Sequence, residues 1–319
     1  MLLIGARSHG NTNSKIVTRV LATVVIIVSF TFLGKVLLQN WNVVKEYAFN
    51  FNYLYLGLSL AFGTLGFIGY SVIWRQIIKQ LDSSTTLSVS SAIRIYSSSA
   101  ITKYIPTSIV LYASRIYLTI SAGVSKTISF ISVFFEGILA IVGQLLFAAV
   151  FLIALPGVAV PLVVLTLVIG IWMAILFRSH HLKAIINFFA RFTGRRLEGE
   201  NIFLPLRAII RIISLYFINA LINGVGFYFL VISFLPSEVA ALPMLMGIYI
   251  FSGVMGTLVF FVPGGLGIRE GLLVALLSLS LPLGVAVVVA LTSRVWTITL
   301  ELLVFGGALV HSKLPRKSQ

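Results

Sequence analysis

The chain has 319 residues, of which 59% are hydrophobic and only 10% are charged. A soluble domain is typically about 45–50% apolar and about 25% charged, so this composition excludes a soluble enzyme and indicates an integral membrane protein along the whole chain. The net charge of +15 arises from basic clusters between hydrophobic segments, a pattern typical of cytoplasmic loops rather than of nucleic-acid binding. The absence of cysteine excludes disulfides and thiol chemistry.

Hydrophobic segments long enough to cross a bilayer recur from the N-terminal part onward. A transmembrane helix needs about 20 apolar residues to cross about 30 Å of hydrocarbon. The sequence therefore predicts an all-α polytopic membrane protein with about eight spans, one or two of them broken or re-entrant. The predicted spans are Ile16–Leu38, Leu54–Trp74, Thr127–Leu155, Val158–Phe177, Ile209–Leu235, Leu242–Val262, Ile268–Leu281 and Gly284–Val310.

The basic residues predict how the chain is oriented. With both termini in the cytoplasm, the linkers expected outside carry a single basic residue, Lys45, whereas the inner linkers carry most of the Lys and Arg. We expect one transmembrane domain over 1–319 in the cytoplasmic membrane, with both ends inside. Its parts are a polar N-terminus (1–15), a first half (16–177), a basic cytoplasmic loop (178–208), a second half (209–310) and a basic tail (311–319).

Residues 87–122 form the first unusual segment, because they are too polar for an ordinary span and too apolar for a free loop. The segment is rich in serine and contains Arg94, Lys103, Pro106 and Arg115. A helix hairpin that enters from the cytoplasm and breaks at Pro106 accounts for this pattern. The alternative is an amphipathic helix that lies in the interface.

The octapeptide Pro263–Glu270 is the second unusual segment. Proline and three glycines interrupt an apolar run, and irregular backbone at membrane depth requires a protein or water-filled environment. The glycines allow close backbone approach, and the helix that begins near Arg269 offers free N–H groups, so the segment predicts an anion-binding corner. Glu270 would neutralise Arg269 in the absence of a ligand. The alternative is that Arg269 and Glu270 only cap a cytoplasmic helix end.

Three further charges, Arg294, Glu301 and Glu136, lie deep within predicted spans. Arg294 and Glu301 are seven residues apart on one helix, or about 10.5 Å along its axis, so each is expected to pair elsewhere. Glu136 is similarly deep. Charges at mid-bilayer are costly and face the protein interior or a wet cavity, although a structural polar network between helices would also explain them.

A broken segment followed by an arginine and then by a span with a glutamate occurs twice, which suggests an internal repeat. Paired broken segments are typical of transporter sites. The pattern does not distinguish a parallel from an inverted repeat. The two series are Pro106, Arg115, Glu136 and Pro263, Arg269, Glu301.

These motifs resemble the lysylphosphatidylglycerol synthase transmembrane-region family, a group of flippase-like membrane proteins. The octapeptide carries the specific part of the resemblance, and the departures are Thr107 and Ser114 where the family pattern has glycine. The soluble aminoacyl-transferase domain of the larger members is not expected, because the chain ends at Gln319 after its last span. The resembling segments are Pro263–Glu270 with Leu272-Leu273, Lys103–Pro106, Ser114-Arg115, Ala122–Ser125 and Phe135-Glu136.

The resemblance and the charges together predict a lipid flippase for an anionic phospholipid or a polyprenyl-phosphate-linked sugar. The alternatives are a non-transporting partner of a glycosyltransferase or lipid synthase of envelope or polysaccharide biosynthesis, and a membrane-embedded transferase with Glu136 or Glu301 as base. We find no catalytic motif and expect no metal, cofactor or nucleic acid. The expected ligand is a membrane lipid or lipid-linked sugar, with an envelope-biosynthesis enzyme as a further partner.

The candidate site residues fall into two groups. The headgroup-binding candidates are Pro263, Gly264, Gly265, Gly267, Arg269, Glu270, Arg294, Arg115 and Lys103. The candidates for the cavity lining or for coupling are Glu136, Glu301, Asn219 and Asn223.

Overall fold

The structure is a computed structural model that describes residues 41–46, 51–104, 109–153, 204–235, 241–259 and 262–313, with a few isolated positions elsewhere. Every regular element in these ranges is helical. The elements are α2 (Trp41–Glu46), α3 (Tyr53–Leu81), α4 (Val89–Ile101), η1 (Thr102–Tyr104), α5 (Ile109–Ser121), α6 (Lys126–Leu152), α9 (Leu206–Ile232), α10 (Leu242–Leu258), η3 (Pro263–Gly265), α11 (Ile268–Leu277) and α12 (Leu283–Lys313).

Four long helices, α3, α6, α9 and α12, confirm the polytopic membrane fold. They have 29, 27, 27 and 31 residues, or at least about 40 Å each, and they are long and apolar enough to cross a bilayer. The predicted spans Ile16–Leu38 and Val158–Phe177 lie almost entirely outside the described residues.

Local sequence signals set where these helices begin. The side chains of Asn52, Ser88 and Ser125 accept hydrogen bonds from the first-turn N–H groups of α3, α4 and α6, which satisfies donors that a helix start leaves free. Gly123 takes a φ of 91° in the turn between α5 and α6, a conformation that favours glycine.

Residues 87–122 form the expected helix hairpin, α4–η1–α5. Its two helices have 13 residues each, or about 20 Å, which is too short to cross a bilayer. Because α4 packs on both α3 and α12 and buries Ile95 and Tyr96, the alternative of an interfacial amphipathic helix is wrong. The predicted break at Pro106 lies outside the described residues.

The second hairpin is α10–η3–α11, and it corrects one predicted span. The segment Ile268–Leu281 was expected to cross the membrane, but α11 has ten residues, or only about 15 Å. Helix α10 ends at Leu258, and the Pro263–Gly265 turn that follows it leads into α11, which packs back on α10. This segment is therefore a broken, re-entrant helix.

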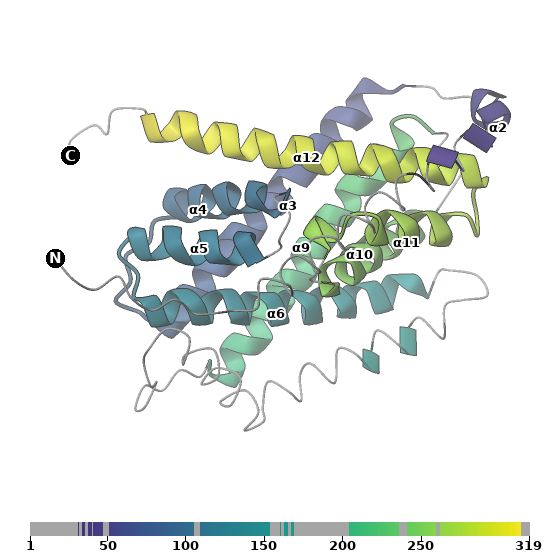
Figure 1. Ribbon diagram of the computed structural model, residues 1–319. Coiled ribbons are helices and arrows are strands. Elements are labelled where there is room, and N and C mark those ends of the chain that lie inside the picture. Colours follow the sequence, from purple (N-terminus) through teal and green to yellow (C-terminus); the bar gives the residue numbers. More distant parts are fainter. Residues whose placement is uncertain are drawn as a thin grey trace, which may run out of the picture.

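The two hairpins enter the helix bundle from opposite ends and meet at their tips (Figure 1), where η1 contacts η3. Helix α12 runs along both of them, packing on α4 toward one end and on α11 toward the other. The two unusual segments of the sequence therefore meet in the middle of the molecule.

The two halves of the chain are inverted relative to each other. The Asn52 N–H donates to the carbonyl of Ser233 at 2.7 Å, so the start of α3 lies at the end of α9 and the two helices are antiparallel. Helices α6 and α12 also run in opposite directions (Figure 1). Each half is a long helix, a hairpin and a long helix, so the repeat is an inverted one, the arrangement common in transporters.

Glycines allow the long helices to approach closely at the interface of α3 and α9. A Cβ added to Gly226 would lie 3.0 Å from the backbone nitrogen of Gly63. Small residues take this role in membrane proteins because lipid provides no hydrophobic drive between helices.

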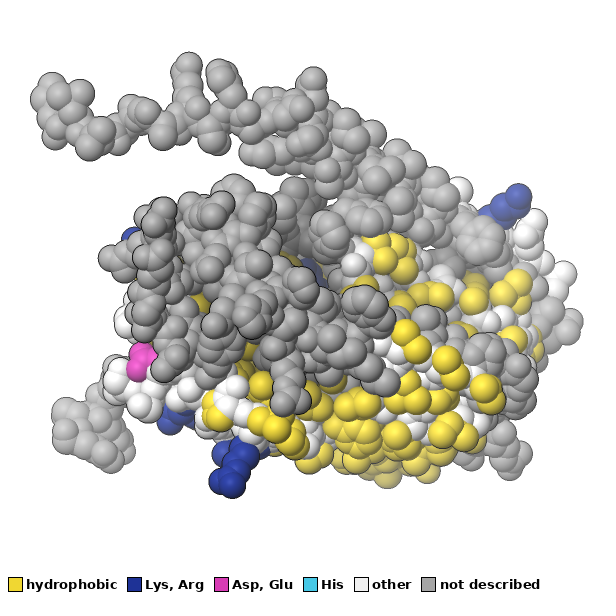
Figure 2. All heavy atoms as spheres, turned by 90° about the horizontal axis from the view of Figure 1, so that it is seen from below, with side chains coloured by type: hydrophobic (Ala, Val, Ile, Leu, Met, Phe, Trp, Pro, Cys, Tyr) yellow, Lys and Arg dark blue, Asp and Glu magenta, His cyan; other side chains and the backbone are white. Residues whose placement is uncertain are grey.

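The outer surface is apolar, as expected for contact with lipid. Figure 2 shows hydrophobic side chains over a broad area of one face, with most of the visible charged side chains at its margins. Large exposed hydrophobic residues occur on all four long helices, including Leu65, Val150, Ile218 and Leu302.

Candidate functional site

Seven charged side chains gather where the hairpin tips meet α6 and α12, and we call them the central charges. Four are cations and three are carboxylates, and all but Lys103 and Arg269 are more than 90% buried. Each lies on or next to a hairpin or near the middle of a long helix. The central charges are Lys103, Arg115, Arg269, Arg294, Glu136, Glu270 and Glu301.

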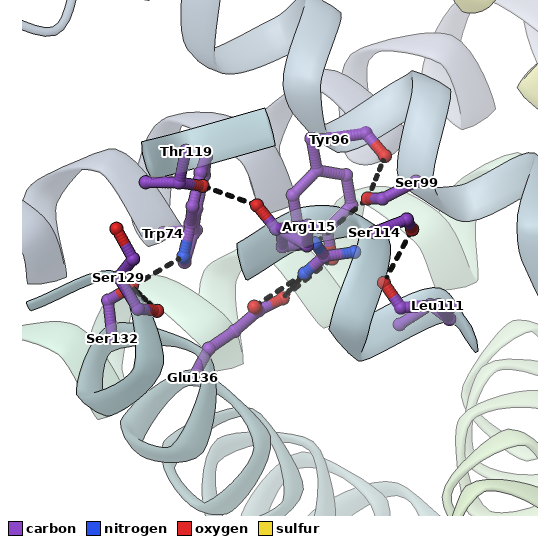
Figure 3. Close-up of polar contacts among 10 residues, drawn as sticks. All are labelled: Trp74, Tyr96, Ser99, Leu111, Ser114, Arg115, Thr119, Ser129, Ser132 and Glu136. Carbon is purple, nitrogen blue, oxygen red and sulfur yellow. Dashed lines mark hydrogen bonds and ion pairs between the residues drawn. The ribbon is translucent and has the colours of Figure 1, made fainter. Parts of the chain in front are cut away.

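Arg115 of α5 and Glu136 of α6 form a closed pair (Figure 3). The Arg115 Nη1 lies 2.6 and 2.5 Å from the two carboxylate oxygens, and its Nε donates to the Ser99 hydroxyl at 3.0 Å. The Tyr96 hydroxyl donates to Glu136 at 2.9 Å, and its ring centroid lies 3.8 Å from the guanidinium carbon. This pair fixes α4 and α5 to α6.

Lys103 and Tyr104 at the tip of the first hairpin both bind Glu301 of α12. The Lys103 ammonium forms an ion pair with Oε1, and the Tyr104 hydroxyl donates to Oε2 at 2.9 Å. Glu301 is buried, and this contact joins η1 to α12.

Glu270 of α11 pairs with Arg294 of α12 and not with Arg269, which corrects the expected pairing. Arg294 Nη1 lies 3.4 Å from Glu270 Oε1 and donates to the Gly264 carbonyl at 3.3 Å. The other carboxylate oxygen accepts the Gly267 N–H at 2.7 Å, which caps the start of α11. Arg294 and Glu301, seven residues apart, each pair elsewhere, as predicted.

The Arg294 pair is incompletely satisfied. Three buried atoms have no hydrogen-bond partner among the described residues: Nε and Nη2 of Arg294 and Oε1 of Glu270. Buried donors of a charged group are costly when unpaired, so Arg294 retains the capacity to bind another acceptor.

Arg269 is the cation without a carboxylate. It donates to the Thr297 hydroxyl at 3.3 Å, and its guanidinium carbon lies 5.0 Å from the centroid of the Tyr249 ring. The described residues place no carboxylate oxygen within 4.0 Å of it. Because the other six central charges form three pairs, the group has a net charge of +1.

Two adjoining cavities open onto these charges. The smaller, which we call the tip cavity, has a volume of about 160 Å³ and is lined by Lys103, Arg269 and Arg294 together with Gly264 and Gly265. None of the described residues that line it is a carboxylate.

The larger, main cavity has a volume of about 300 Å³. It shares Lys103 and Arg269 with the tip cavity and extends to Arg115, Glu136 and Glu301. An anion in the tip cavity would therefore meet three cations directly, whereas a group in the main cavity would also meet two carboxylates.

Comparison with protein families connects this arrangement to known proteins. Residues 16–304 match the family described as lysylphosphatidylglycerol synthase TM region. The chain belongs to this family. A search of curated proteins found no match.

The octapeptide Pro263–Glu270, which carries the family resemblance, places its three glycines in conformations that favour glycine. Gly264, Gly265 and Gly267 have φ values of 58°, 64° and 85°. A Cβ on Gly265 would lie 2.8 Å from the carbonyl oxygen of Gly256. The glycines therefore let η3 pack on α10, and Gly264 leaves space beside Arg294 and Lys103.

The two asparagines expected at the cavity have different positions. Asn223 lines the main cavity, with its amide donating to the carbonyl of Asn219 at 2.8 Å. Asn219 does not line it and instead lies against Gly69 of α3, so it joins helices. Pro263 begins η3 at the tip of its hairpin.

Sequence reasoning missed several uncharged members of the site, among them Tyr104, Tyr249 and Thr297. Thr297 lies three residues after Arg294 and four before Glu301, on one helix face, so periodicity could have identified it. Tyr249 lies on α10 and contacts Arg269 only through the tertiary fold, so no local signal marks it.

Proposed function

We propose that this protein moves a lipid with an anionic headgroup, either an anionic phospholipid or a polyprenyl-phosphate-linked sugar, across the cytoplasmic membrane. The observation that carries this proposal is Arg269, which has no carboxylate partner among the described residues and shares the tip cavity with Lys103 and Arg294. The name of the matched family refers to a phospholipid, which supports a lipid as the ligand.

Electrostatics favours an anion at this position. A charge at mid-bilayer costs at least about 2.5 kcal/mol on insertion scales, and a surplus cation in the interior is stabilised by a bound counter-charge. Guanidinium groups bind phosphate oxygens through charge-assisted hydrogen bonds, and two nitrogens of the buried Arg294 have no partner among the described residues. A phosphate would therefore satisfy both Arg269 and Arg294.

The position of the site along α12 suits transport. Arg294 lies about 17 Å from the start of this helix and Glu301 about 18 Å from its end. Hairpins from opposite ends meet there, so a movement of either hairpin would open the site to one side of the membrane, as in transporters with inverted repeats. The headgroup enters from the cytoplasmic side, and the Lys103–Glu301 and Arg294–Glu270 pairs exchange partners as it passes.

The hydrocarbon tail stays in lipid during this movement. Tyr112 of α5 and Thr257 of α10 line both cavities and are also exposed at the outer surface. They mark a lateral opening through which the tail of a bound lipid extends into the bilayer.

The test is headgroup translocation by the purified chain in vesicles that contain phosphatidylglycerol. Arg269→Gln removes the surplus charge and should lower the translocation rate at least about tenfold, the equivalent of about 1.4 kcal/mol. The matched control is Arg207→Gln, since Arg207 is exposed on α9 and lines neither cavity. If Arg269→Gln and Glu270→Gln both translocate at the unsubstituted rate, the proposed site is wrong.

The same measurement separates the alternatives. A protein that only scaffolds an envelope enzyme would move no lipid when pure, and a transferase would form product from a lipid-linked donor. Each of the two deep carboxylates, Glu136 and Glu301, is held by a cation and a tyrosine hydroxyl, which makes both poor candidates for a free base. Transport by the pure protein is therefore the result that we expect.

A further inference from the structure

We infer that the central charges select a headgroup with one negative charge, a phosphodiester, over a diphosphate or a phosphomonoester. This inference rests on the proposed function and specifies its ligand. Both a phospholipid such as phosphatidylglycerol and a polyprenyl-phosphoryl sugar carry a phosphodiester, so the two lipid sources share the required chemistry.

The first argument is the charge balance. Each of the three carboxylates has one cationic partner, which leaves Arg269 as a fourth cation without a carboxylate among the described residues. The central charges therefore have a net charge of +1. Arg75 does not alter the balance, because it lines neither cavity and donates to the Leu87 carbonyl at 2.6 Å. The undescribed residues that follow η1 in the sequence, 105–108, and those that precede η3, 260–261, include no ionisable side chain.

The second argument is the environment. Coulomb energies rise steeply as the effective dielectric constant falls, so the net charge of a bound complex matters more inside a membrane protein than at its surface. A phosphodiester leaves the complex neutral. A diphosphate, or a phosphomonoester with about −1.5 to −2 charges at pH 7, leaves it negative, and a zwitterionic headgroup leaves it positive.

The third argument is the distribution of charge between the cavities. The tip cavity has a volume of about 160 Å³ and is lined by three cations and, among the described residues, by no carboxylate. That space suits one phosphate group. A second phosphate would extend into the main cavity, where Glu136 and Glu301 line the wall and would repel it.

The experiment measures lipid binding to the full chain in detergent by native mass spectrometry. The probes are phosphatidylglycerol, a polyprenyl-phosphoryl hexose, the corresponding diphosphate-linked hexose, phosphatidic acid and phosphatidylethanolamine. At pH 7.5 we expect both phosphodiesters to bind at least about tenfold more tightly than the diphosphate or phosphatidic acid. Equal or tighter binding of the diphosphate would overturn the inference.

Charge variants provide the decisive arm. Glu301→Gln and Glu270→Gln each raise the net charge to +2 at a different pair, so both should shift the preference toward the diphosphate. Arg269→Gln lowers the charge to zero and should bring phosphatidylethanolamine level with phosphatidylglycerol. Arg207→Gln is the control and should leave the ranking unchanged. A ranking that does not follow the net charge, in variants that still bind lipid, contradicts the inference.

A shift in pH tests the same idea without a substitution. The second pKa of a phosphomonoester is about 6, so phosphatidic acid is mainly monoanionic at pH 5. Its binding relative to phosphatidylglycerol should therefore rise between pH 7.5 and pH 5. If no anionic lipid binds above phosphatidylethanolamine in any condition, the proposed function fails. If all anionic lipids bind equally, only the charge selection fails.

Discussion

At the scale of single residues, the interior of this protein is organised by pairing. Arg115 and Glu136 share hydrogen bonds with Ser99 and Tyr96 in a buried cluster, whereas the part of the chain that the structure describes offers Arg269 no carboxylate partner. A satisfied pair supports the fold, and an unsatisfied charge is available to a ligand. The same residue type therefore has two different roles, and its partners decide which.

The pairing predicts how Arg115 substitutions affect stability. Arg115→Leu leaves Glu136 buried without its counter-charge, which should cost about 3–5 kcal/mol and lower the midpoint of thermal unfolding in detergent. The double variant Arg115→Leu with Glu136→Leu should recover most of this loss, because two apolar groups replace the pair. Arg94→Leu, an exposed position on the same hairpin, should change the midpoint little. A double variant no more stable than Arg115→Leu would show that the pair is not the cause.

At the scale of elements, the octapeptide follows α10 and turns the chain back into α11. Gly265 combines a positive φ with a backbone contact to Gly256, so both conformation and space require glycine there. The turn holds η3 against η1 and places Gly264 beside Arg294. Backbone geometry and the charged site thus depend on the same residues.

The turn predicts opposite effects for two glycine substitutions. Gly265→Ala must adopt a left-handed conformation, which costs about 1–2 kcal/mol, and must also displace the Gly256 carbonyl, so it should lower the unfolding midpoint. Gly271→Ala lies in α11 with no atom within 4 Å of the added Cβ, and should stabilise the helix by about 0.5–1 kcal/mol. Thermal unfolding of both variants checks this, and a neutral Gly265→Ala would contradict the packing argument.

At the scale of the whole molecule, the two halves form an inverted repeat whose hairpins enter from opposite ends (Figure 1). The link between α3 and α4 and the link between α11 and α12 therefore lie at opposite ends of the bundle. A membrane protein built this way presents those links on opposite sides of the bilayer.

Cysteine labelling tests this arrangement cleanly, because the chain contains no cysteine. Ser84→Cys and Leu279→Cys replace exposed residues in the two links. With the expected orientation, a membrane-impermeant maleimide should label Leu279→Cys in intact cells and Ser84→Cys only after permeabilisation. Labelling of both positions from the same side would exclude the inverted arrangement.

Much of the fold could be predicted because its signals are local. Hydropathy identified the long helices, and the proline and glycine content of the octapeptide identified a break. The span predicted at Ile268–Leu281 was wrong because hydropathy measures apolar length, and α11 is apolar but re-entrant.

The membrane character, the broken segments and the deep charges follow directly from the order of residues, since burying a charge or a broken backbone in lipid is costly wherever it occurs. The partners of those charges do not follow from the order of residues. Glu270 binds Arg294 rather than its neighbour Arg269, and Lys103 reaches Glu301 across 198 positions, because both hairpins pack along α12. The net charge of the central charges, and with it the candidate ligand, therefore depends on the partners that the tertiary fold gives to the other six.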